Sequence, residues 1–387
     1  MTSKHKQSNN TPLKPHTSSL RGKRKVFVGV SGGVDSSVAL ALLKEEGYDV
    51  TGVFLKVWNP DFLPCDWREE RRSAMRVCAT LGVPFLTFDF EKEYKKEVVD
   101  YMVREYSVGR VPNPDVFCNK YVKFGVFLKK SLEMGADFIA TGHYAKVESR
   151  KAQGASQYEL QESKDKEKDQ SYFLYTLGQE ELKHTLFPVG GLLKPEVRKL
   201  AWKFGLPTAE KKDSQGLCFI GKIDMKDFLT HYIDTKPGNV LNTKGEVVGR
   251  HDGAMFYTIG QRHGFNITKK SPRDPRYFVV SKDLDKNIIK VASKELESEK
   301  IYSTKEIIVE NLHFINPRQR LELGEKLDCY VRIRYRQEKQ SCILEKKKDS
   351  FYIVFDEMQN GITVGQSAVF YDSSVCLGGG IIEAIVQ

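Results

Sequence analysis

The stretch VGVSGGVDSS, residues 28–37, holds residue types that suit one chemical task, the binding of phosphate. Two glycines follow an apolar run, and Asp35 and Ser36 stand where a helix is expected to begin. Glycines allow a tight turn with inward N–H groups, and a helix N-terminus adds partial positive charge. Asp35 would hold the Mg²⁺ that accompanies a triphosphate. The alternative interpretation is a plain strand–helix turn capped by a serine.

The same residues, SGGVDSS, resemble the pyrophosphate-binding loop of the ATP pyrophosphatase superfamily. Enzymes of that superfamily cleave ATP between its α and β phosphates while an oxygen atom of the second substrate is adenylated. The resemblance implies that the two glycines clear space for the leaving pyrophosphate.

Cys118 is the first of two cysteines in a setting that favours reactivity. It belongs to RVPNPDVFCNKYVKFG, in which Pro112 and Pro114 make the preceding loop rigid. Lys120 and Lys123 follow at the expected start of a helix. Because nearby cations and helix N-terminal amides stabilise a thiolate, we expect this thiol to have a lowered pKa.

Cys218 is the second, and KKDSQGLCFIG places it in a Gly-flanked, loop-like stretch behind residues 211–213. Taken alone, each of the two cysteines also fits an inert, small apolar residue, the interpretation we give to Cys78, Cys329 and Cys342. The combination points further, because an adenylating loop activates an oxygen atom that a thiol or persulfide can displace. Loop and cysteines together predict sulfur transfer.

The elements that position these residues alternate between strand and helix from residue 25 onward. KVFVGV, DVTGVFLKV, VPFLTFDF and ADFIATGH predict strands, and amphipathic segments between them predict helices. Such alternation indicates an α/β fold with a doubly wound parallel sheet covered on both faces. We expect this catalytic domain over residues 25–222, with a loop or hairpin at SRKAQGASQYELQESKDKEKDQ.

The rest of the chain has a different pattern. Residues 223–298 predict a small mixed central domain, with a helix at residues 225–232. Residues 299–387 form short alternating segments broken by Gly, Asp and Asn, which predicts an antiparallel β-barrel. In CYVRIRYRQ, alternation would put Arg332, Arg334 and Arg336 on one strand face. That face is either simply solvated or suited to RNA phosphates.

Composition limits the partners and the compartment. The net charge is +10, but residues 1–25 carry seven Lys/Arg and no acid, and the rest holds 54 Lys/Arg against 51 Asp/Glu. A nucleic-acid partner must therefore be argued from local patches. No apolar run approaches the roughly 20 residues that span a bilayer. Seven cysteines without a C-x-x-C pair indicate a reducing compartment and give little support to a zinc or iron–sulfur site.

Residues 1–24 are polar and basic, and they lack the apolar core of a secretory signal. We expect a disordered tail and a cytoplasmic protein of the bacterial type. The alternative is a mitochondrial presequence, because acids are absent. Against it, Lys outnumbers Arg, and only Leu13 and Leu20 are available for an apolar face.

Eight ordered motifs together resemble the tRNA-specific 2-thiouridylases over residues 25–387. They are SGGVDSS, NPDVFCNKYVKF, ATGHYA, KDQSYFL, DSQGLCFIG, YTIGQRHG, RYRQ and GQSAVFY with CLGGGII. The resemblance implies an adenine nucleotide alpha-hydrolase-like N-terminal domain and an ATP-dependent tRNA sulfurtransferase.

The resemblance also implies roles for individual residues. Cys118 would be the nucleophile, Cys218 would carry a persulfide, and the two would form a transient disulfide. Asp115 is a plausible general acid/base. Leu55 stands where the family commonly has Met, and another apolar residue beside adenine should serve. The residues implied in ATP binding are Gly29, Val30, Ser31, Gly32, Gly33, Val34, Asp35, Ser36, Leu55 and Gly142.

Contacts with tRNA are implied at three further places. Asn113, Pro114 and Asp115 would contact the target base. His143 would lie near the tRNA, although from the residues alone it also fits a core histidine, and the segment before SYFLYTLG also fits a helix cap. The other implied contacts are Lys168, Asp169, Gln170, Arg334, Tyr335 and Gln366.

The implied reaction begins when the wobble uridine, position 34, leaves the anticodon loop for the pocket. ATP adenylates its C2 oxygen, the persulfide of Cys218 attacks C2, and Cys118 helps to release the sulfur. The products are 2-thiouridine, AMP and pyrophosphate. The implied partners are tRNA and a sulfur-donor or sulfur-relay protein, and we expect a monomer.

Two other functions stay open. Another ATP pyrophosphatase, such as a ligase acting on a small amide or carboxylate, would keep the loop but need neither cysteine. A non-enzymatic RNA-binding protein with a decayed loop is the third hypothesis, and the intact SGGVDS sequence argues against it.

Overall fold

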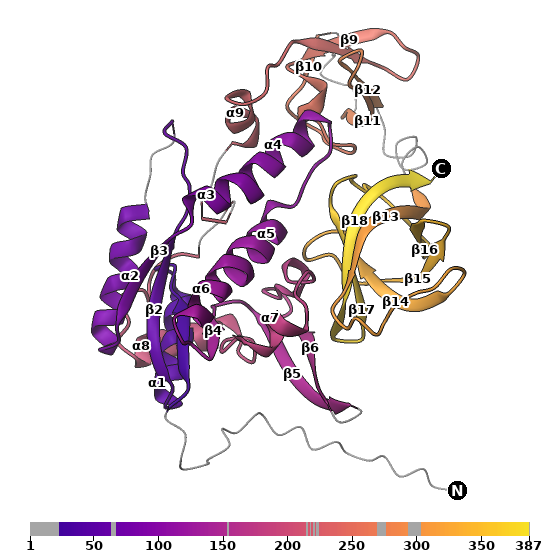
Figure 1. Cartoon of the computed structure of the whole chain (residues 1–387). Helices are drawn as coiled ribbons and strands as arrows, with labels where there is room; N and C mark the ends of the chain where they lie inside the picture. Colours follow the sequence, from indigo (N-terminus) through magenta and orange to yellow (C-terminus); the bar gives the residue numbers. More distant parts are fainter. Residues whose placement is uncertain are drawn as a thin grey trace, which may run out of the picture.

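The computed structural model describes residues 23–62, 67–152, 155–213, 216, 218–219, 221, 224–268, 276–292 and 303–386. The expected tail lies outside them except for Lys23 and Arg24, and Cys65 lies outside them as well. Within the described part of the chain, no helix is both long and apolar enough to cross a bilayer. Figure 1 shows an α/β module, a small mixed sheet above it and a barrel beside it.

The α/β module is built on five parallel strands in the order β3-β2-β1-β4-β7. Val26 and Val28 of β1 enter one core cluster and Phe27 enters the other, because successive strand residues point to opposite faces. Both faces are therefore buried, as the continuous apolar runs predict. The strands are β1 (Lys25–Gly29), β2 (Asp49–Lys56), β3 (Phe85–Asp89), β4 (Phe138–Ala140) and β7 (Thr185–Leu186).

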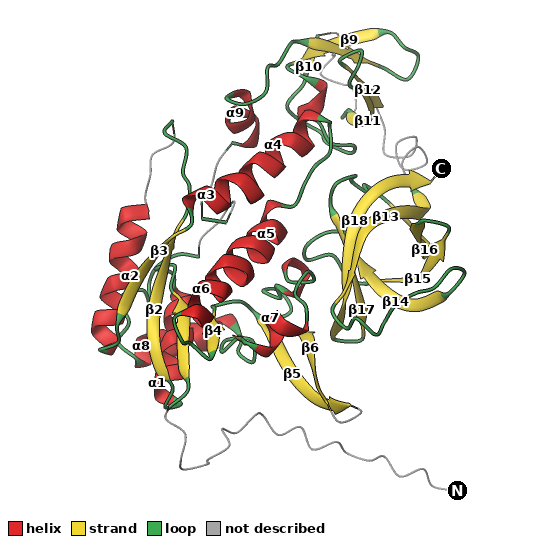
Figure 2. Ribbon diagram, in the orientation of Figure 1, coloured by secondary structure: helices red, strands yellow, loops and turns green. Residues whose placement is uncertain are grey.

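Helices cover both faces of this sheet (Figure 2). One face carries α1 (Val34–Glu45), α2 (Trp67–Leu81) and α8 (Lys194–Lys203). The other face carries α3 (Glu91–Tyr94), α4 (Asp100–Ser107), α5 (Pro114–Phe117) and α6 (Phe127–Glu133), with π-helical turns at Lys95–Val99 and Cys118–Val126. The doubly wound α/β fold predicted from the sequence is confirmed.

The hydrophilic stretch after β4 forms a hairpin, one of the two outcomes expected for it. The hairpin consists of β5 (Ala145–Ala152) and β6 (Ala155–Glu162). Strand β6 also pairs with β18 of the C-terminal barrel, with Gln161 opposite Val375 and Leu160 opposite Cys376. The hairpin therefore joins the barrel sheet to the α/β module. Helix α7 (Gln179–Lys183) and a 3₁₀ turn at Ser171–Phe173 follow it.

The C-terminal module is a closed antiparallel barrel of six strands, as predicted. It runs β13-β16-β15-β14-β17-β18 and closes through pairing of β13 with β18. Its interior is a separate apolar cluster that includes Ile307, Leu344 and Phe370. The strands are β13 (Thr304–Phe314), β14 (Lys326–Arg332), β15 (Gln340–Lys347), β16 (Ser350–Gln359), β17 (Ser367–Asp372) and β18 (Val375–Val386).

The central module is mixed, as expected. Its sheet runs β10-β9-β8-β12-β11, in which β8 and β12 are parallel and the other pairs are antiparallel. The expected helix is α9 (Met225–Thr230). The strands are β8 (Gly238–Leu241), β9 (Val247–His251), β10 (Asn266–Ile267), β11 (Phe278–Asp283) and β12 (Ile288–Ala292).

Candidate active site

The phosphate loop, residues 29–36, leads from β1 into α1 through a turn that only glycine can make. Gly32 has φ +78°, and a Cβ at this position would lie 2.5 Å from the carbonyl oxygen of Glu70. Ser36 Oγ accepts a hydrogen bond from Ser31 N–H at 3.2 Å and donates one to the Gly33 carbonyl at 3.3 Å. These bonds hold the loop in its turn at the N-terminus of α1.

Gly142 and Leu55 lie at the same edge of the sheet. Gly142 follows β4, and a Cβ there would lie 2.5 Å from Ser36 N, so glycine lets β4 approach the loop. Leu55, next to last in β2, is buried beside Phe88 of β3. The strand order reverses between β1 and β4, and open α/β sheets bind ligands at the carboxyl ends of strands near such a reversal.

Several cations lie beside the loop, and the sequence interpretation assigned a role to only one of them, Lys168. Lys194 Nζ lies 2.6 and 2.8 Å from the two carboxylate oxygens of Asp35 and 2.9 Å from Asp213. Asp213 also accepts from Lys168 and Arg198, each at 2.8 Å. Burial raises the pKa of Asp213, but the bonds from Lys168 and Lys194 outweigh burial, and the pKa falls to about 2.

Lys211 binds the loop from the segment that carries Cys218. Its Nζ donates to the Gly32 carbonyl at 3.0 Å and to Glu70 Oε2 at 2.6 Å. The only sequence signal for Lys211 was its place in the KKDSQGLC motif. Lys194 and Lys211 put two ammonium groups beside inward-pointing loop amides, an arrangement suited to a polyphosphate.

The expected Mg²⁺ role of Asp35 is not supported by an open ligand position. Both of its carboxylate oxygens accept from Lys194, and Tyr144 OH also donates to one of them at 2.8 Å. Among the described residues, no group of three or more His, Cys, Asp or Glu side chains could hold a metal ion. The protein residues present therefore do not form a magnesium cage, and no step below depends on one.

Cys118 and Cys218 lie next to each other, with their sulfur atoms 3.6 Å apart. Cys118 is fully buried where α5 passes into its π-helical turn. The backbone of Cys218 is held on both sides, because its N–H donates to Asp115 Oδ1 at 3.1 Å and its carbonyl accepts from Tyr94 OH at 2.7 Å. Two segments a hundred residues apart thus form one dithiol site.

The lowered pKa expected for Cys118 belongs instead to Cys218. The hydrogen bond from Cys118 and the charge of Lys123 lower the pKa of Cys218 to about 7, against the opposing effect of burial. Burial, together with the neighbouring sulfur, raises the pKa of Cys118 well above its usual range. The expectation was wrong because Cys118 lies inside a continuous helical run, residues 114–133, and not at a free helix N-terminus. Cys218 is therefore the thiolate of the pair.

Lys123 connects the dithiol to the phosphate loop through His143. Burial and the charge of Lys123 hold the pKa of His143 well below its usual range, so the ring is neutral. His143 Nε2 lies 3.3 Å from Lys123 Nζ and accepts its hydrogen bond, which leaves the ring proton on Nδ1, 2.7 Å from Thr141 Oγ1. His143 directly follows Gly142, which touches the loop. The nucleotide and sulfur sites are therefore contiguous.

Lys123 itself stays charged. Burial lowers its pKa, but the charges of Cys218 and Cys118 outweigh burial and raise the pKa to about 12. Burial also raises the pKa of Asp115, partly offset by Lys123 and by the hydrogen bond from the Cys218 N–H. Asn113 stands at the N-cap of α5 and Pro114 at its first position, so this turn presents Asp115 toward Cys218.

Three consecutive family models match the chain: a tRNA methyl transferase HUP domain at residues 24–222, a tRNA methyl transferase PRC-barrel domain at 226–293, and an aminomethyltransferase beta-barrel domain at 304–382. The tRNA-specific 2-thiouridylase MnmA of Pseudomonas paraeruginosa (strain DSM 24068 / PA7) is 45% identical over 365 residues, which cover 93% of this chain and 95% of the relative. This chain belongs to the tRNA-specific 2-thiouridylase family.

One further relative and one solved structure were also found to be similar. The MnmA protein of Stutzerimonas stutzeri (strain A1501) is 45% identical over 370 residues, 95% of this chain and 96% of that protein. A solved U34-tRNA thiolase from Methanococcus maripaludis is 18% identical over 56% of this chain and 66% of its own, with a TM-score of 0.34. That score is too low to support a conclusion about fold or function.

Residues 168–170, expected to contact tRNA, form hydrogen bonds mostly within the protein. The Asp169 side chain is 1% exposed and accepts from Ser163 N–H, Ser171 Oγ and Arg332, at 2.8 to 2.9 Å. Gln170 Oε1 accepts from Tyr144 N–H at 3.0 Å. Their side chains therefore fix the chain around the site, and a contact with tRNA at this segment would fall to Lys168.

The expected row of three arginines does not form. Strand β14 ends at Arg332, whose side chain is 11% exposed and paired with Glu162 and Asp169 at 2.8 and 2.9 Å. Arg336 lies in the following turn with φ +64°. Alternation holds only while a strand continues, so it could not extend to Arg334 and Arg336.

Tyr335 and Gln366 reach the active-site side of the barrel. The Tyr335 ring packs 4.5 Å from that of Phe173, and Arg334 donates to the Gly361 carbonyl. Gln366 Nε2 donates to the carbonyls of Val111 and Pro112 at 3.0 and 3.1 Å. The structure thus brings Gln366 to the chain that enters α5, while Arg334 lies on the exposed rim.

Proposed function

We propose that this protein is an ATP-dependent tRNA 2-thiouridylase, which replaces the C2 oxygen of the wobble uridine, position 34, with sulfur. The observation that carries the proposal is the 3.6 Å separation of the Cys118 and Cys218 sulfurs beside a phosphate loop. A small-molecule ligase of the same superfamily would need the loop but no paired thiols. The relatives named as tRNA-specific 2-thiouridylases, at 45% identity over nearly the whole chain, support the same conclusion.

The first proposed step activates the base. The C2 oxygen of uracil attacks the α-phosphorus of ATP, the bond to the bridging oxygen breaks, and pyrophosphate leaves. Loop amides and the ammonium groups of Lys194 and Lys211 are placed to stabilise the charge on that leaving group. On binding, the triphosphate would take these cations from Asp35 and Glu70. Mg²⁺ that accompanies the triphosphate would add further charge neutralisation.

The target base is proposed to lie against residues 113–115, next to the dithiol. A flipped base must be stacked and held away from solvent while its C2 atom is attacked. Asp115 is the proposed general acid/base, since burial raises its pKa. His143 is neutral and accepts a hydrogen bond from Lys123, and we propose that its ring lies between the base and the nucleotide.

The second step transfers sulfur. The terminal sulfur of a Cys218 persulfide attacks C2, and AMP leaves with the former C2 oxygen, which gives a C2–S–S–Cys218 linkage. The Cys118 thiol then gives its proton to Asp115 and its sulfur attacks Cys218 Sγ, the S–S bond to the base sulfur breaks, and 2-thiouridine is released. The two cysteines are left as a disulfide, which a thiol reductant must open before a sulfur-donor or sulfur-relay protein reloads Cys218. The lowered pKa of Cys218, about 7, supports its assignment as the residue that accepts sulfur.

The remaining proposals concern the setting of the reaction. We propose a monomer in the cytoplasm, with tRNA as substrate, and a mitochondrial location as the alternative if residues 1–24 are a presequence. A fluorescent fusion of the full chain and gel filtration with light scattering test these two points. The boundaries of the catalytic, central and barrel domains at residues 222 and 298 likewise stay proposals.

Nucleoside analysis of tRNA from cells that lack this protein tests the function. We expect loss of 2-thiouridine at the wobble position, restored by the wild-type gene and by Cys329→Ala, but not by Cys118→Ser or Cys218→Ser. Persistence of 2-thiouridine would refute the proposal. Full activity of both serine variants in ATP cleavage would favour a small-molecule ligase, and failure of the purified protein to release pyrophosphate with tRNA would favour an RNA-binding role.

A further inference from the structure

The four residues that lead into the active site are held by both other modules. We call residues 109–112 the strap. They join α4 to α5, and Asn113, Pro114 and Asp115 follow directly. In Figure 1 the connection between α4 and α5 passes between the central sheet and the barrel. The strap therefore lies where all three modules meet.

The central module holds the strap through Lys282 of β11. Its Nζ donates to the Gly109 carbonyl at 2.5 Å and to the Tyr257 carbonyl at 2.9 Å. Within the described residues, no carboxylate forms an ion pair with Lys282, and burial lowers its pKa to about 8. Leu284, in the turn after β11, packs on Gly109, which has φ +73°. A buried ammonium is thus used to bind two backbone carbonyls.

The YTIGQRHG motif builds the socket for this lysine. Gln261 Oε1 accepts from Thr258 N–H at 3.0 Å, Gly260 N–H donates to Val279 at 2.8 Å, and Val279 N–H donates back to Gln261 at 3.0 Å. These bonds fix the Tyr257 carbonyl in front of Lys282. Lys282 also lines a cavity of about 70 Å³, together with Gly109 and Val111 of the strap, Thr258 of the motif and Val364 of the barrel.

The barrel holds the other side of the strap. Val111 N–H donates to the Val364 carbonyl at 3.0 Å, and Gln366 binds the carbonyls of Val111 and Pro112. Gly365 has φ +94°, and a Cβ there would lie 2.8 Å from Val111 N. The barrel backbone therefore approaches the strap as closely as a glycine allows.

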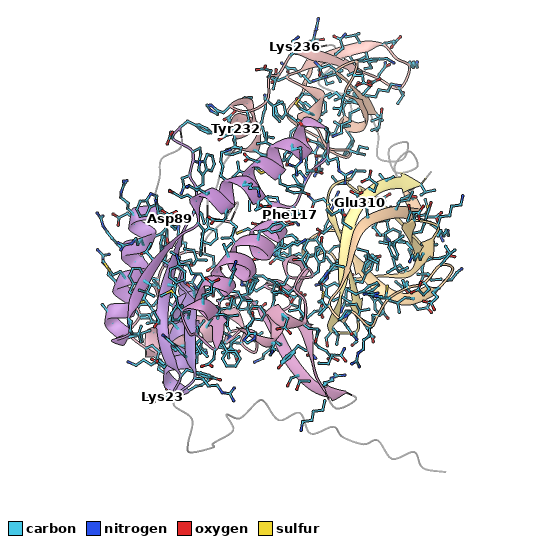
Figure 3. All side chains as sticks on the ribbon, in the orientation of Figure 1. Lys23, Asp89, Phe117, Tyr232, Lys236 and Glu310 are labelled. Atoms are coloured by element: carbon cyan, nitrogen blue, oxygen red, sulfur yellow. The ribbon has the colours of Figure 1, made fainter. Side chains whose placement is uncertain are left out.

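A charged network reinforces this contact. Arg110 Nε lies 2.9 Å from Glu105, and its other nitrogens pair with Glu310 and Glu383 of the barrel. Figure 3 marks Glu310 on the side of the barrel that faces the α/β module. Carboxylates from α4, β13 and β18 thus meet on one guanidinium.

We propose that Lys282 and the barrel segment 364–366 clamp the strap from two sides and so set the position of residues 113–118. Lys282 is a positioning residue, and this inference rests on the proposed thiolation reaction. Only two residues separate the strap from Asp115, which holds the backbone N–H of Cys218. A loosened strap lets Asp115 and Cys118 move relative to Cys218, and a displacement near 1 Å costs on the order of a hundredfold in rate.

The test removes each side of the clamp in the full-length protein. We expect Lys282→Met to lower kcat for 2-thiouridine formation in tRNA by about tenfold or more, with KM for ATP unchanged, because the phosphate loop does not contact the strap. Lys286→Met, on an exposed lysine of the same hairpin, is the control and should match wild type. Gly365→Ala should give the same kinetic pattern from the barrel side. Gly324→Ala is its control, with a similar φ of +82° and open space around the added Cβ.

The double variant and hydrogen exchange separate positioning from a general loss of stability. Because both substitutions loosen one element, the Lys282→Met, Gly365→Ala protein should be little slower than the slower single variant, whereas independent effects multiply. Amide exchange in the peptide that covers residues 109–118 should accelerate in both single variants. Unchanged exchange, a normal kcat in Lys282→Met, or multiplied losses with a raised KM for ATP would each overturn the proposal. The exchange experiment needs no catalysis, so it stays decisive even if the wild-type protein fails to thiolate tRNA.

Discussion

The sulfur atoms of Cys118 and Cys218 lie 3.6 Å apart, although a hundred residues separate them in the chain. Cys118 lies in the helical run of residues 114–133. Cys218 belongs to the segment whose Lys211 donates a hydrogen bond to the phosphate loop. The same short segment thus contacts both the nucleotide loop and the dithiol. A change in the position of this segment would therefore affect both sites.

The first prediction concerns the reactivity of Cys218. Its pKa is lowered to about 7, so about half of it is thiolate at pH 7. Since only the thiolate reacts, the rate of alkylation by iodoacetamide should rise with pH and reach half of its maximum near pH 7. Peptide mass spectrometry across pH 5.5 to 9 measures this profile, and a midpoint at the ordinary value of roughly 8.5 would contradict it.

The barrel supplies a matched control for that experiment. Cys329 and Cys342 lie 3.7 Å apart on neighbouring strands, but the hydrogen bond with Cys329 and burial raise the pKa of Cys342. Cys342 should stay unlabelled while Cys218 reacts. Lys123→Met should shift the Cys218 midpoint upward, because it removes a cation that stabilises the thiolate. Lys120→Met, on an exposed lysine of the same helical run, should leave the midpoint in place.

The second prediction concerns the close approach of β4 to the phosphate loop. Gly142→Ala would place a methyl group 2.5 Å from Ser36 N, and backbone atoms cannot easily yield. Overpacking of this kind costs about 1–3 kcal/mol, and because the loop must be in place for ATP to bind, we expect the KM for ATP to rise by about 5- to 160-fold. Gly191→Ala in the same module has open space and should behave as wild type. ATP titrations of pyrophosphate release measure the difference, and equal KM values for the two variants would exclude a nucleotide site at this loop.

The third prediction concerns Lys194. Its ammonium group bridges Asp35 and Asp213 and is placed to bind a phosphate oxygen when ATP enters. Lys194→Met removes one charge-assisted hydrogen bond, worth about 1.5–3 kcal/mol, and should weaken ATP binding about ten- to hundredfold. Lys203→Met, on the exposed part of the same helix, is the control. Isothermal titration with a non-hydrolysable ATP analogue measures both, and unaltered affinity in Lys194→Met would remove this residue from the nucleotide site.

The fourth prediction concerns the buried ion pairs between the barrel and the hairpin. Arg332→Met leaves the carboxylates of Glu162 and Asp169, which are 3% and 1% exposed, without their guanidinium. Breaking a buried pair on one side costs about 3–5 kcal/mol of unfolding free energy. Glu162 keeps its ion pairs with Lys166 and Lys339, so most of the loss should come from Asp169. Urea unfolding followed by circular dichroism checks this, with Lys326→Met at the exposed start of β14 as the control.

A loss below 1 kcal/mol in Arg332→Met would show that water reaches these carboxylates. Tryptophan fluorescence is a poor probe for this experiment, because Trp58, Trp67 and Trp202 all belong to the α/β module. Circular dichroism reports on the barrel strands as well.

The local sequence was sufficient to predict the main strands and helices and the phosphate loop. Apolar runs predicted the sheet because β1 and β2 are buried on both faces, and the glycines predicted the turn because Gly32 has φ +78°. The pairing of Cys118 with Cys218 came only from the resemblance to a family. Nothing in the spacing of two distant segments states that they meet.

The errors and omissions share a physical cause. Alternation put Arg332 on an exposed strand face, but its partners are Glu162, at the end of β6, and Asp169, in the segment that follows β6. The pKa of Cys118 was misjudged because burial, which depends on the whole fold, outweighs nearby lysines. Lys194 and Tyr94 carried no local signal, since each acts on a residue more than a hundred positions away.

The pairing of β6 with β18 has a consequence for synthesis of the chain on the ribosome. The outer edge of β6 acquires its partner only when residues 375 and 376 have emerged, more than 200 residues after β6 itself. Until then the hydrogen-bonding groups on this edge of β6 have no partner strand, and Glu162 and Asp169 lack their ion pair with Arg332. An arrested or prematurely terminated polypeptide could therefore contain all the residues proposed for catalysis and still lack the β6–β18 pairing and the ion pairs of Arg332.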